Sequence, residues 1–106
     1  MSTFIGYHHL PPMSDSKFLE LCKSSDTKKL KEAILNGTNV NAKDNDGCTA
    51  LMKATTMGYI ETAELLLKHG ANINAKDIHY YTALTWAEFY GRTETADLLR
   101  KYGGAE

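Results

Sequence analysis

The sequence lacks the charge imbalance and the long apolar runs that mark several large classes of protein. Its 106 residues include only two prolines and two cysteines, and twelve Lys and Arg nearly balance thirteen Asp and Glu. Nucleic-acid-binding domains usually carry a basic face and a high pI, whereas this chain has a net charge of −1 and a pI of about 6.4. The composition therefore disfavours a nucleic-acid partner.

Signals for membranes and export are also missing. No apolar run approaches the roughly 18 residues that a membrane-spanning helix needs, so we expect no membrane partner. Residues 1–13 (MSTFIGYHHLPPM) carry no Lys or Arg and no apolar stretch before a small-residue cleavage site, unlike a secretory signal. Cys22 and Cys48 lack CxxC spacing and are interpreted as small apolar residues in a reducing compartment. We expect a cytoplasmic protein in which residues 1–13 form a leader, either disordered or packed on the first repeat.

Motifs of catalysis and cofactor binding are absent as well. The chain contains no phosphate-binding glycine loop and no HExxH, CxxC or GxSxG sequence. Two alternatives remain: Cys22 or Cys48 with a histidine as nucleophile and base, and zinc held by His8, His9 and a cysteine. Nothing in the sequence brings these residues together. We expect no catalytic, cofactor-binding or metal-binding residue, and no cofactor.

What the sequence does contain is an internal repeat of 33 residues. Residues 44–73 and 77–106 are identical at 13 of 30 positions. In the first of these segments the identical residues are Asp44, Thr49, Ala50, Leu51, Ala54, Gly58, Glu61, Thr62, Ala63, Leu65, Leu66, Lys68 and Gly70. A fixed period of this length is typical of stacked supersecondary units, none of which can bury its apolar face alone.

The repeated pattern begins Asp-x-x-Gly-x-Thr-Ala-Leu at Asp44 and continues Gly-x-x-Glu-x-x-x-Leu-Leu-Leu-x-x-Gly-Ala-Asn-Ile-Asn from Gly58. It resembles the ankyrin repeat, whose period is 33. The resemblance implies an all-α solenoid of three stacked helix-turn-helix repeats with short β-turn tips. We place an N-terminal capping repeat at 14–43, a middle repeat at 44–76 and a C-terminal capping repeat at 77–106. The first shares with the second only Gly37, Asn39, Asn41, Ala42 and Lys43.

Six helices in three antiparallel pairs are expected from the capping signals. In the first repeat, N-cap oxygens at 14–16 open a helix through Cys22, and a break at 24–26 leads to a second helix that ends before Gly37. The later repeats predict helices near 49–57, 61–69, 82–90 and 94–102. Apolar positions of the middle repeat become polar at the ends, since Leu65 corresponds to Glu32 and Leu67 to Arg100. We therefore expect a complete solenoid with two polar caps.

Two departures from the family pattern bear on stability. The family sequence Thr-Pro-Leu-His reads Thr-Ala-Leu-Met from Thr49 and Thr-Ala-Leu-Thr from Thr82. The preset φ of proline and the hydrogen bonds of the histidine are lost, so we expect modest stability. Tyr80 stands where the middle repeat has Gly47. A bulky residue disfavours the positive φ of that turn, which we expect to be reshaped or strained.

The resemblance also implies where a partner would bind, namely at the turn tips and the open face of each first helix. Six of the ten aromatic residues lie in the last 30 positions, and exposed aromatic residues are common interface anchors. The alternative is that these rings cap the open end of the stack. The predicted partner-binding residues are Asn45, Asp46, Cys48, Thr56, Met57, Ile78, His79, Tyr81, Trp86, Phe89 and Tyr90.

The sequence thus predicts a non-catalytic protein–protein interaction module, a scaffold or adaptor whose partner is an unidentified protein. We expect a monomer, or weak self-association through the aromatic face. One alternative is a structural fragment or subunit without binding specificity of its own. A weaker alternative is a metal- or thiol-dependent role through His8, His9, Cys22 and Cys48.

Overall fold

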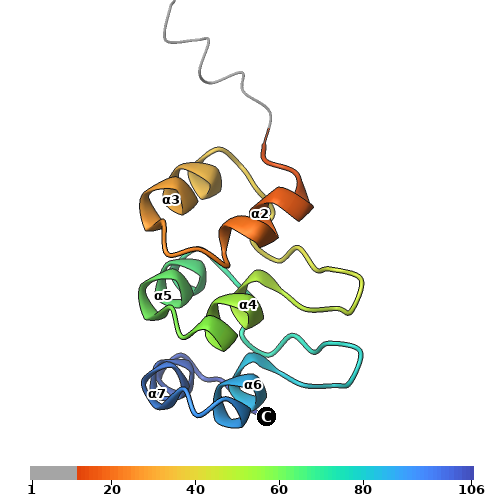
Figure 1. The fold of residues 1–106 in the computed structure, drawn as a ribbon, viewed down its shortest axis with the longest axis vertical. Coiled ribbons are helices and arrows are strands. Elements are labelled where there is room, and N and C mark those ends of the chain that lie inside the picture. The colour runs from red at the N-terminus through yellow and green to blue at the C-terminus, as the bar shows by residue number, and fades with distance from the viewer. Residues whose placement is uncertain (1–11) are drawn as a thin grey trace, which may run out of the picture.

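The computed structural model describes residues 12–106, which form six α-helices in three antiparallel pairs (Figure 1). The pairs are α2 (Asp15–Leu21) with α3 (Thr27–Leu35), α4 (Ala50–Met57) with α5 (Ile60–Lys68), and α6 (Ala83–Phe89) with α7 (Thr93–Lys101). They stack in chain order along the long axis of the molecule. The predicted all-α solenoid of three stacked helix pairs is confirmed.

Some predictions lie beyond what the structure describes. The leader at 1–13 falls outside the described residues except for Pro12 and Met13, and His8 and His9 fall outside with it. The repeat boundaries at 43/44 and 76/77 also stay predictions. Within residues 12–106, no helix is long and apolar enough to cross a membrane.

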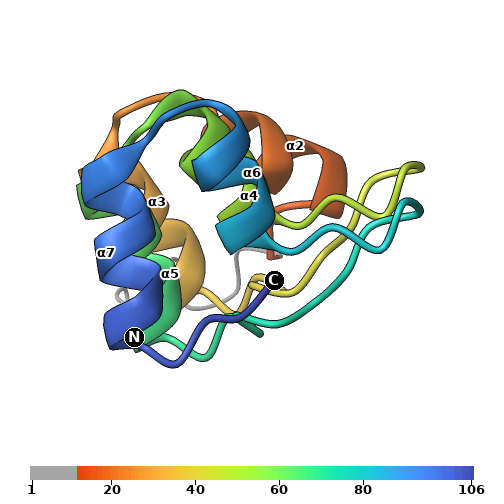
Figure 2. The same cartoon turned by 90° about the horizontal axis from the view of Figure 1, so that it is seen from below.

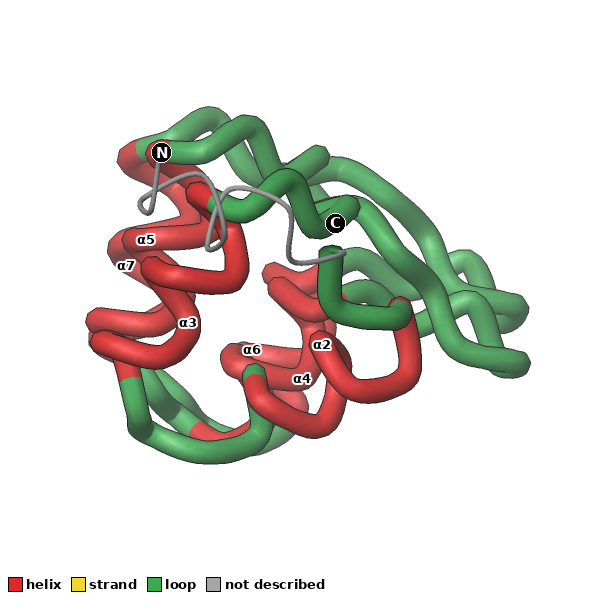
Figure 3. Tube along the Cα trace, turned by 90° about the horizontal axis from the view of Figure 1, so that it is seen from above, coloured by secondary structure: helices red, strands yellow, loops and turns green. Residues whose placement is uncertain are grey.

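The helices form two layers (Figures 2 and 3). Helices α2, α4 and α6 lie in one layer and α3, α5 and α7 in the other. Helix α4 packs against α5 of its own pair and α6 of the next, while α5 packs against both α3 and α7. The long connections 36–49 and 69–82 project beyond the α2–α4–α6 layer on the same side. This layer and the projecting loops together form the surface on which the predicted binding residues lie.

The second and third pairs begin at threonine N-caps. The hydroxyl of Thr49 accepts a hydrogen bond from the Met52 N–H at 3.2 Å, and that of Thr82 from the Thr85 N–H at 3.3 Å. In return the Thr49 N–H donates to the Met52 sulfur at 3.5 Å, and the Thr82 N–H to the Thr85 hydroxyl at 3.2 Å. The expected loss of the histidine link is therefore compensated in part, because Met52 and Thr85 still bond back to the cap.

Small and branched residues fill the contacts between neighbouring pairs. Ala54, Ala63 and Ala87 are completely buried, which allows helix backbones to approach closely. Leu66 and Leu99 are also completely buried. These buried positions recur 33 residues apart, as expected when each pair covers the apolar face of the one before it.

Asparagine side chains connect the loops of successive repeats. The Asn41 side chain accepts a hydrogen bond from the Asn72 N–H at 2.7 Å and donates one to the Gly70 carbonyl at 3.3 Å. One repeat later, the Asn74 side chain accepts from the Ala105 N–H at 2.9 Å. Backbone groups at the turns between stacked repeats are thereby satisfied without a β-sheet, and residues 12–106 contain only one antiparallel bridge, between Lys43 and Thr49.

The last pair presents a polar end face. Met52 and Thr55 are buried in α4, which packs against α6, and the equivalent positions in α6 are Thr85, which is half-buried, and Glu88, which is exposed. The Glu88 carboxylate pairs with the Arg100 guanidinium at 2.6 Å. Polar residues thus replace the positions that would contact a further repeat.

Replacing Leu66 with Ala tests the stacking. We expect the free energy of unfolding to fall by about 2–5 kcal/mol, because a completely buried leucine between two repeats leaves a cavity. Urea unfolding followed by circular dichroism measures the change. The matched control is Leu35→Ala, since Leu35 is 70% exposed and should change stability by less than about 0.5 kcal/mol. Equal urea midpoints for the two variants would show that Leu66 is not a stacking residue.

Candidate functional site

Each projecting loop is organised by one aspartate. One Asp44 oxygen accepts hydrogen bonds from the N–H groups of Asp46 and Cys48, both at 2.9 Å. In the third repeat the equivalent oxygen of Asp77 accepts from the N–H of His79 at 2.8 Å and from that of Tyr81 at 3.0 Å. The two turns are therefore built alike, and they present the residues at their tips in equivalent places.

The second oxygen of each aspartate has a different partner in the two repeats. Asp44 pairs with the Lys53 ammonium at 2.7 Å, whereas Asp77 accepts a hydrogen bond from the Trp86 indole N–H at 3.0 Å. Burial opposes ionisation of the Asp44 carboxyl, but the hydrogen bonds from Lys53, Cys48 and Asp46 outweigh it and lower its pKa. Trp86 thus takes the structural place of Lys53. Its ring is half-buried rather than fully at the surface.

Around Trp86 the rings of the third repeat touch one another. The Tyr81 and Phe89 rings meet it edge-on, with centroids at 5.4 and 6.1 Å, and the Tyr90 ring stacks at 6.0 Å and 20°. Phe89 and Tyr90 also meet edge-on at 5.1 Å. We call the set Ile78, Tyr80, Tyr81, Trp86, Phe89 and Tyr90 the aromatic patch.

Most of the aromatic patch is exposed. Tyr80 is 78% exposed, Phe89 74%, Ile78 57%, Tyr90 51% and Tyr81 43%. These side chains are large and apolar, and soluble domains seldom leave so many of them together in water. The aromatic patch is therefore the principal apolar surface among the described residues of the third repeat.

The residues predicted for the middle repeat lie on the same side but form no comparable cluster. Asn45 and Asp46 are exposed at the loop tip, Cys48 and Thr56 are half-buried, and Met57 is 41% exposed. The third-repeat counterpart of Asp46 is His79, which is exposed at the other loop tip. Its ring lies 5.7 Å from that of Tyr81.

Two residues at this surface were missing from the predicted set. Arg92, the N-cap residue of α7, donates a hydrogen bond from its Nε to the Thr56 carbonyl at 3.1 Å, which joins the end of α4 to the start of α7. Tyr80 was noted only as an unusual turn residue, yet it projects from the loop tip. Its substitution for glycine was the one signal in the sequence, whereas nothing local marked Arg92.

The turn at Tyr80 is strained and not reshaped. Its φ is +65°, close to the +76° of Gly47, and its N–H bonds to the Asp77 carbonyl just as the Gly47 N–H bonds to that of Asp44. Of the two outcomes expected from the sequence, reshaping is therefore wrong. Holding a side chain in this left-handed region costs roughly 1–2 kcal/mol.

Gly47 is required for a second reason that does not apply at position 80. A Cβ at position 47 would lie 3.2 Å from the Cα of Asp77 and from the N of Ile78, because the loop of the third repeat crosses directly beside it. The Ile78 N–H also donates to the Asp46 carbonyl at 3.0 Å. No described loop covers Tyr80 in the same way, so only its backbone conformation is unfavourable.

Neither cysteine is a ready nucleophile. Burial raises the pKa of the Cys22 thiol to about 12. Burial, followed by the charge of Asp44, also raises the pKa of the Cys48 thiol. Both shifts disfavour the thiolate that nucleophilic or metal-binding chemistry needs. Within residues 12–106, no three His, Cys, Asp or Glu side chains gather closely enough to hold a metal ion.

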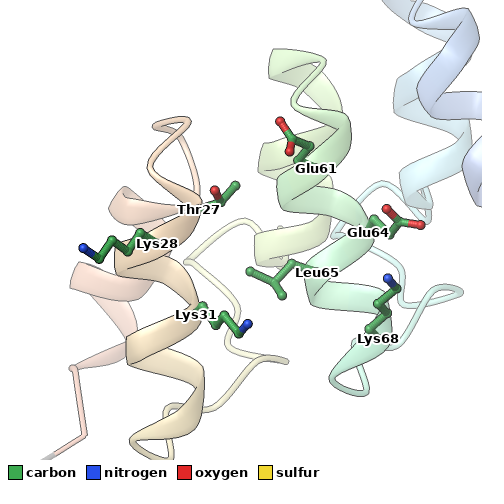
Figure 4. A pocket seen from close by; sticks show the side chains of 7 residues that line it. All are labelled: Thr27, Lys28, Lys31, Glu61, Glu64, Leu65 and Lys68. Carbon is green, nitrogen blue, oxygen red and sulfur yellow. The ribbon is translucent and has the colours of Figure 1, made fainter.

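The outer layer carries a shallow pocket between α3 and α5 (Figure 4). It is lined by Thr27, Lys28, Lys31, Glu61, Glu64, Leu65 and Lys68. Two of its lysines come from α3, and the two glutamates, the third lysine and the half-buried leucine come from α5, so the pocket has no field of one sign. This arrangement is typical of a solvated outer face.

Substitutions of Trp86 test its bond to Asp77. Trp86→Ala should lower the free energy of unfolding by about 2–3 kcal/mol, because it leaves a carboxylate that is 5% exposed without its side-chain donor. Trp86→Lys should lose about half as much or less, since lysine reproduces the Asp44–Lys53 pair. Urea unfolding compares the two variants. If lysine is as damaging as alanine, packing of the ring is what matters and not the bond.

Tyr80→Gly should raise the free energy of unfolding by about 0.5–1 kcal/mol, because relief of the strained φ exceeds the added freedom of the unfolded chain. Gly47→Ala is the matched control and should destabilise, given the same φ and the backbone beside it. Thermal unfolding of both variants provides the measurement. A drop of several degrees for Tyr80→Gly would mean that its ring packs on the third repeat.

Comparison with known proteins agrees with the architecture. No curated protein matches the chain significantly. A family model described as ankyrin repeats (3 copies) matches residues 19–106, which is most of the chain and includes the end of α2 and all of α3 to α7. Together with the 33-residue period and the stacked pairs, this match shows that the chain belongs to the ankyrin-repeat family.

Proposed function

We propose that this protein is a binding module that holds another protein against its projecting loops and its α2–α4–α6 layer, without catalysis of its own. Ankyrin repeats are generally protein–protein interaction modules and are typically non-catalytic. The single observation that carries the proposal for this chain is the aromatic patch, five of whose six side chains are more than two-fifths exposed.

The position of the rings argues for an interface more than for a cap. Trp86, Phe89 and Tyr90 occupy the places of Lys53, Thr56 and Met57 in the middle repeat. Those places are half-buried or exposed even though a third repeat is stacked beside them. The end face of the stack is formed instead by polar residues, namely Thr85, Glu88 and Arg100. Trp86 is in contact with Tyr81 of the projecting loop, and the exposed rings of Phe89 and Tyr90 lie against Trp86, where a partner can reach them.

The energy available is sufficient for binding. A few hundred Å² of apolar surface removed from water contributes several kcal/mol at about 25 cal/mol per Å². Association entropy and side-chain ordering oppose this contribution. The rings are already braced against Trp86 and against one another, so less conformational freedom is lost when a partner covers them. The aromatic patch is therefore the proposed energetic centre, and the polar loop tips of the middle repeat form its rim.

We place this activity in the cytoplasm. The support is that both cysteines are free thiols, one of them in the core. Small domains of oxidising compartments commonly rely on disulfides instead.

The test is affinity capture from cells that express the protein. We compare wild type with Phe89→Ser/Tyr90→Ser, a double variant that alters two exposed rings and leaves the Trp86–Asp77 bond in place. We expect a partner retained by wild type to be lost from the double variant. The control is Leu35→Ser, which removes an equally exposed apolar side chain from the outer layer, on α3. Equal retention of the partner by wild type and the double variant would refute the proposed surface.

A further inference from the structure

The exposed rings have the area that an interface requires. Burying an aromatic side chain removes roughly 150–250 Å² from water, so the exposed fractions of Tyr80, Tyr81, Phe89 and Tyr90 amount to about 400–600 Å². A standard protein–protein interface buries about 800 Å² on each partner. These four rings alone would supply half or more of that area, with the neighbouring polar residues as rim.

The aromatic patch is elongated and can complement itself. Its exposed members include Ile78 and Tyr80 in the projecting loop and Phe89 and Tyr90 at the end of α6, with the Tyr81–Trp86 ring contact joining loop and helix. Figure 2 shows the tip of this loop well apart from α6. Its rings are arranged both edge-on and stacked. Aromatic pairs favour both geometries. A two-fold axis through the middle would lay the loop end of one copy over the helix end of the other.

The charges at the two ends suit the same arrangement. Asp46 is exposed at the loop end, where its carbonyl accepts the Ile78 N–H at 3.0 Å. Arg92 is exposed at the helix end, two residues beyond Tyr90. In a dimer that places the loop end of one copy over the helix end of the other, Asp46 of each copy faces Arg92 of the other. The two contacts then join opposite charges. A net charge of −1 per chain adds little repulsion between copies.

The strained backbone at Tyr80 is a second, independent observation that favours a function for the aromatic patch. The backbone adopts φ +65° there although glycine would avoid the strain, and the ring it holds is the most exposed of the aromatic patch. Strained residues concentrate where function requires a fixed geometry. The Tyr80 side chain is 78% exposed and is therefore available for contact with another molecule.

From these observations we infer that the aromatic patch pairs two copies of this chain in an antiparallel dimer with two-fold symmetry. The inference rests on the proposed function, because it names the occupant of the same surface. The rings form the centre of the interface, Tyr80 is a projecting anchor, and the Asp46–Arg92 pairs fix the relative direction of the two copies.

Sedimentation velocity over a concentration series tests the dimer with the full chain. Wild type should dimerise reversibly with a dissociation constant below about 1 mM, the weak end of specific association. Phe89→Ser should weaken dimerisation at least tenfold, and Leu35→Ser should leave it unchanged. Tyr80→Gly should weaken dimerisation while raising the melting temperature of the monomer. A purely structural role for Tyr80 cannot give these opposite signs. Monomeric wild type at every concentration, or a dimer indifferent to Phe89→Ser, would overturn the inference.

Charge reversal tests the direction of pairing. Asp46→Arg alone places Arg against Arg92 at both contacts, and Arg92→Asp alone places Asp against Asp46, so each variant should dimerise more weakly than wild type. Mixing the two variants restores both pairs, and native mass spectrometry should then show heterodimers in excess over either homodimer. A statistical mixture would overturn the antiparallel arrangement. Thermal unfolding of each variant confirms that it is folded.

The two experiments distinguish failure of the dimer from failure of the proposed binding surface. If wild type stays monomeric and still captures a protein through Phe89 and Tyr90, the dimer is wrong and the binding surface stands. If wild type dimerises, Phe89→Ser abolishes the dimer and no other protein is retained by the surface, the dimer stands and the surface serves self-association alone.

Discussion

A pair of short antiparallel helices cannot cover its own apolar face, and the structure depends on the next pair covering it. Leu66 is completely buried on α5, which packs against both α3 and α7, and Leu99 is completely buried on α7, which packs against α5. Ala54 and Ala87 are completely buried at the same 33-residue spacing. Each further feature of the stack follows from this constraint, from the asparagine bonds between loops to the polar end face. Because contacts join only neighbouring pairs, stability is shared along the stack rather than held in one centre.

The stacking constraint also explains why the third repeat can differ from the second. Two requirements favour glycine at position 47. Its φ is positive, and the backbone of the next loop lies 3.2 Å from where a Cβ would be. Only the first requirement applies at position 80, so a tyrosine fits there at the expense of strain. In the same way Asp77 needs a donor at the position of Lys53, and Trp86 supplies one with an indole N–H. Position 80, whose counterpart Gly47 is constrained by the next loop, is thus free to carry a ring in the third repeat.

The sequence predicted the stack well because its signals are local and repeated. The helices differ from prediction by about one residue at their ends, where Thr49 and Thr82 act as caps and not as first helical residues. What the sequence could not predict depends on side-chain positions in space. The Met52 sulfur accepting an N–H, the Trp86–Asp77 bond and the reach of Arg92 to the Thr56 carbonyl have no pattern in the chain. The contacts among the aromatic rings also depend on side-chain positions and could not be predicted from the sequence.

The core and the proposed binding surface are nearly separate, and Trp86 is where they meet. Phe89, Tyr90 and Tyr80 are largely exposed, so other side chains at these positions would change the surface with little effect on stacking. Trp86 differs, because it satisfies the buried Asp77 carboxylate with its N–H and supports the neighbouring rings with its faces and edges. Asp77 in turn holds the loop tip through the N–H groups of His79 and Tyr81. One hydrogen bond thus ties the geometry of the loop to that of the helix face, and the two halves of the surface are held in a fixed relation before any partner arrives.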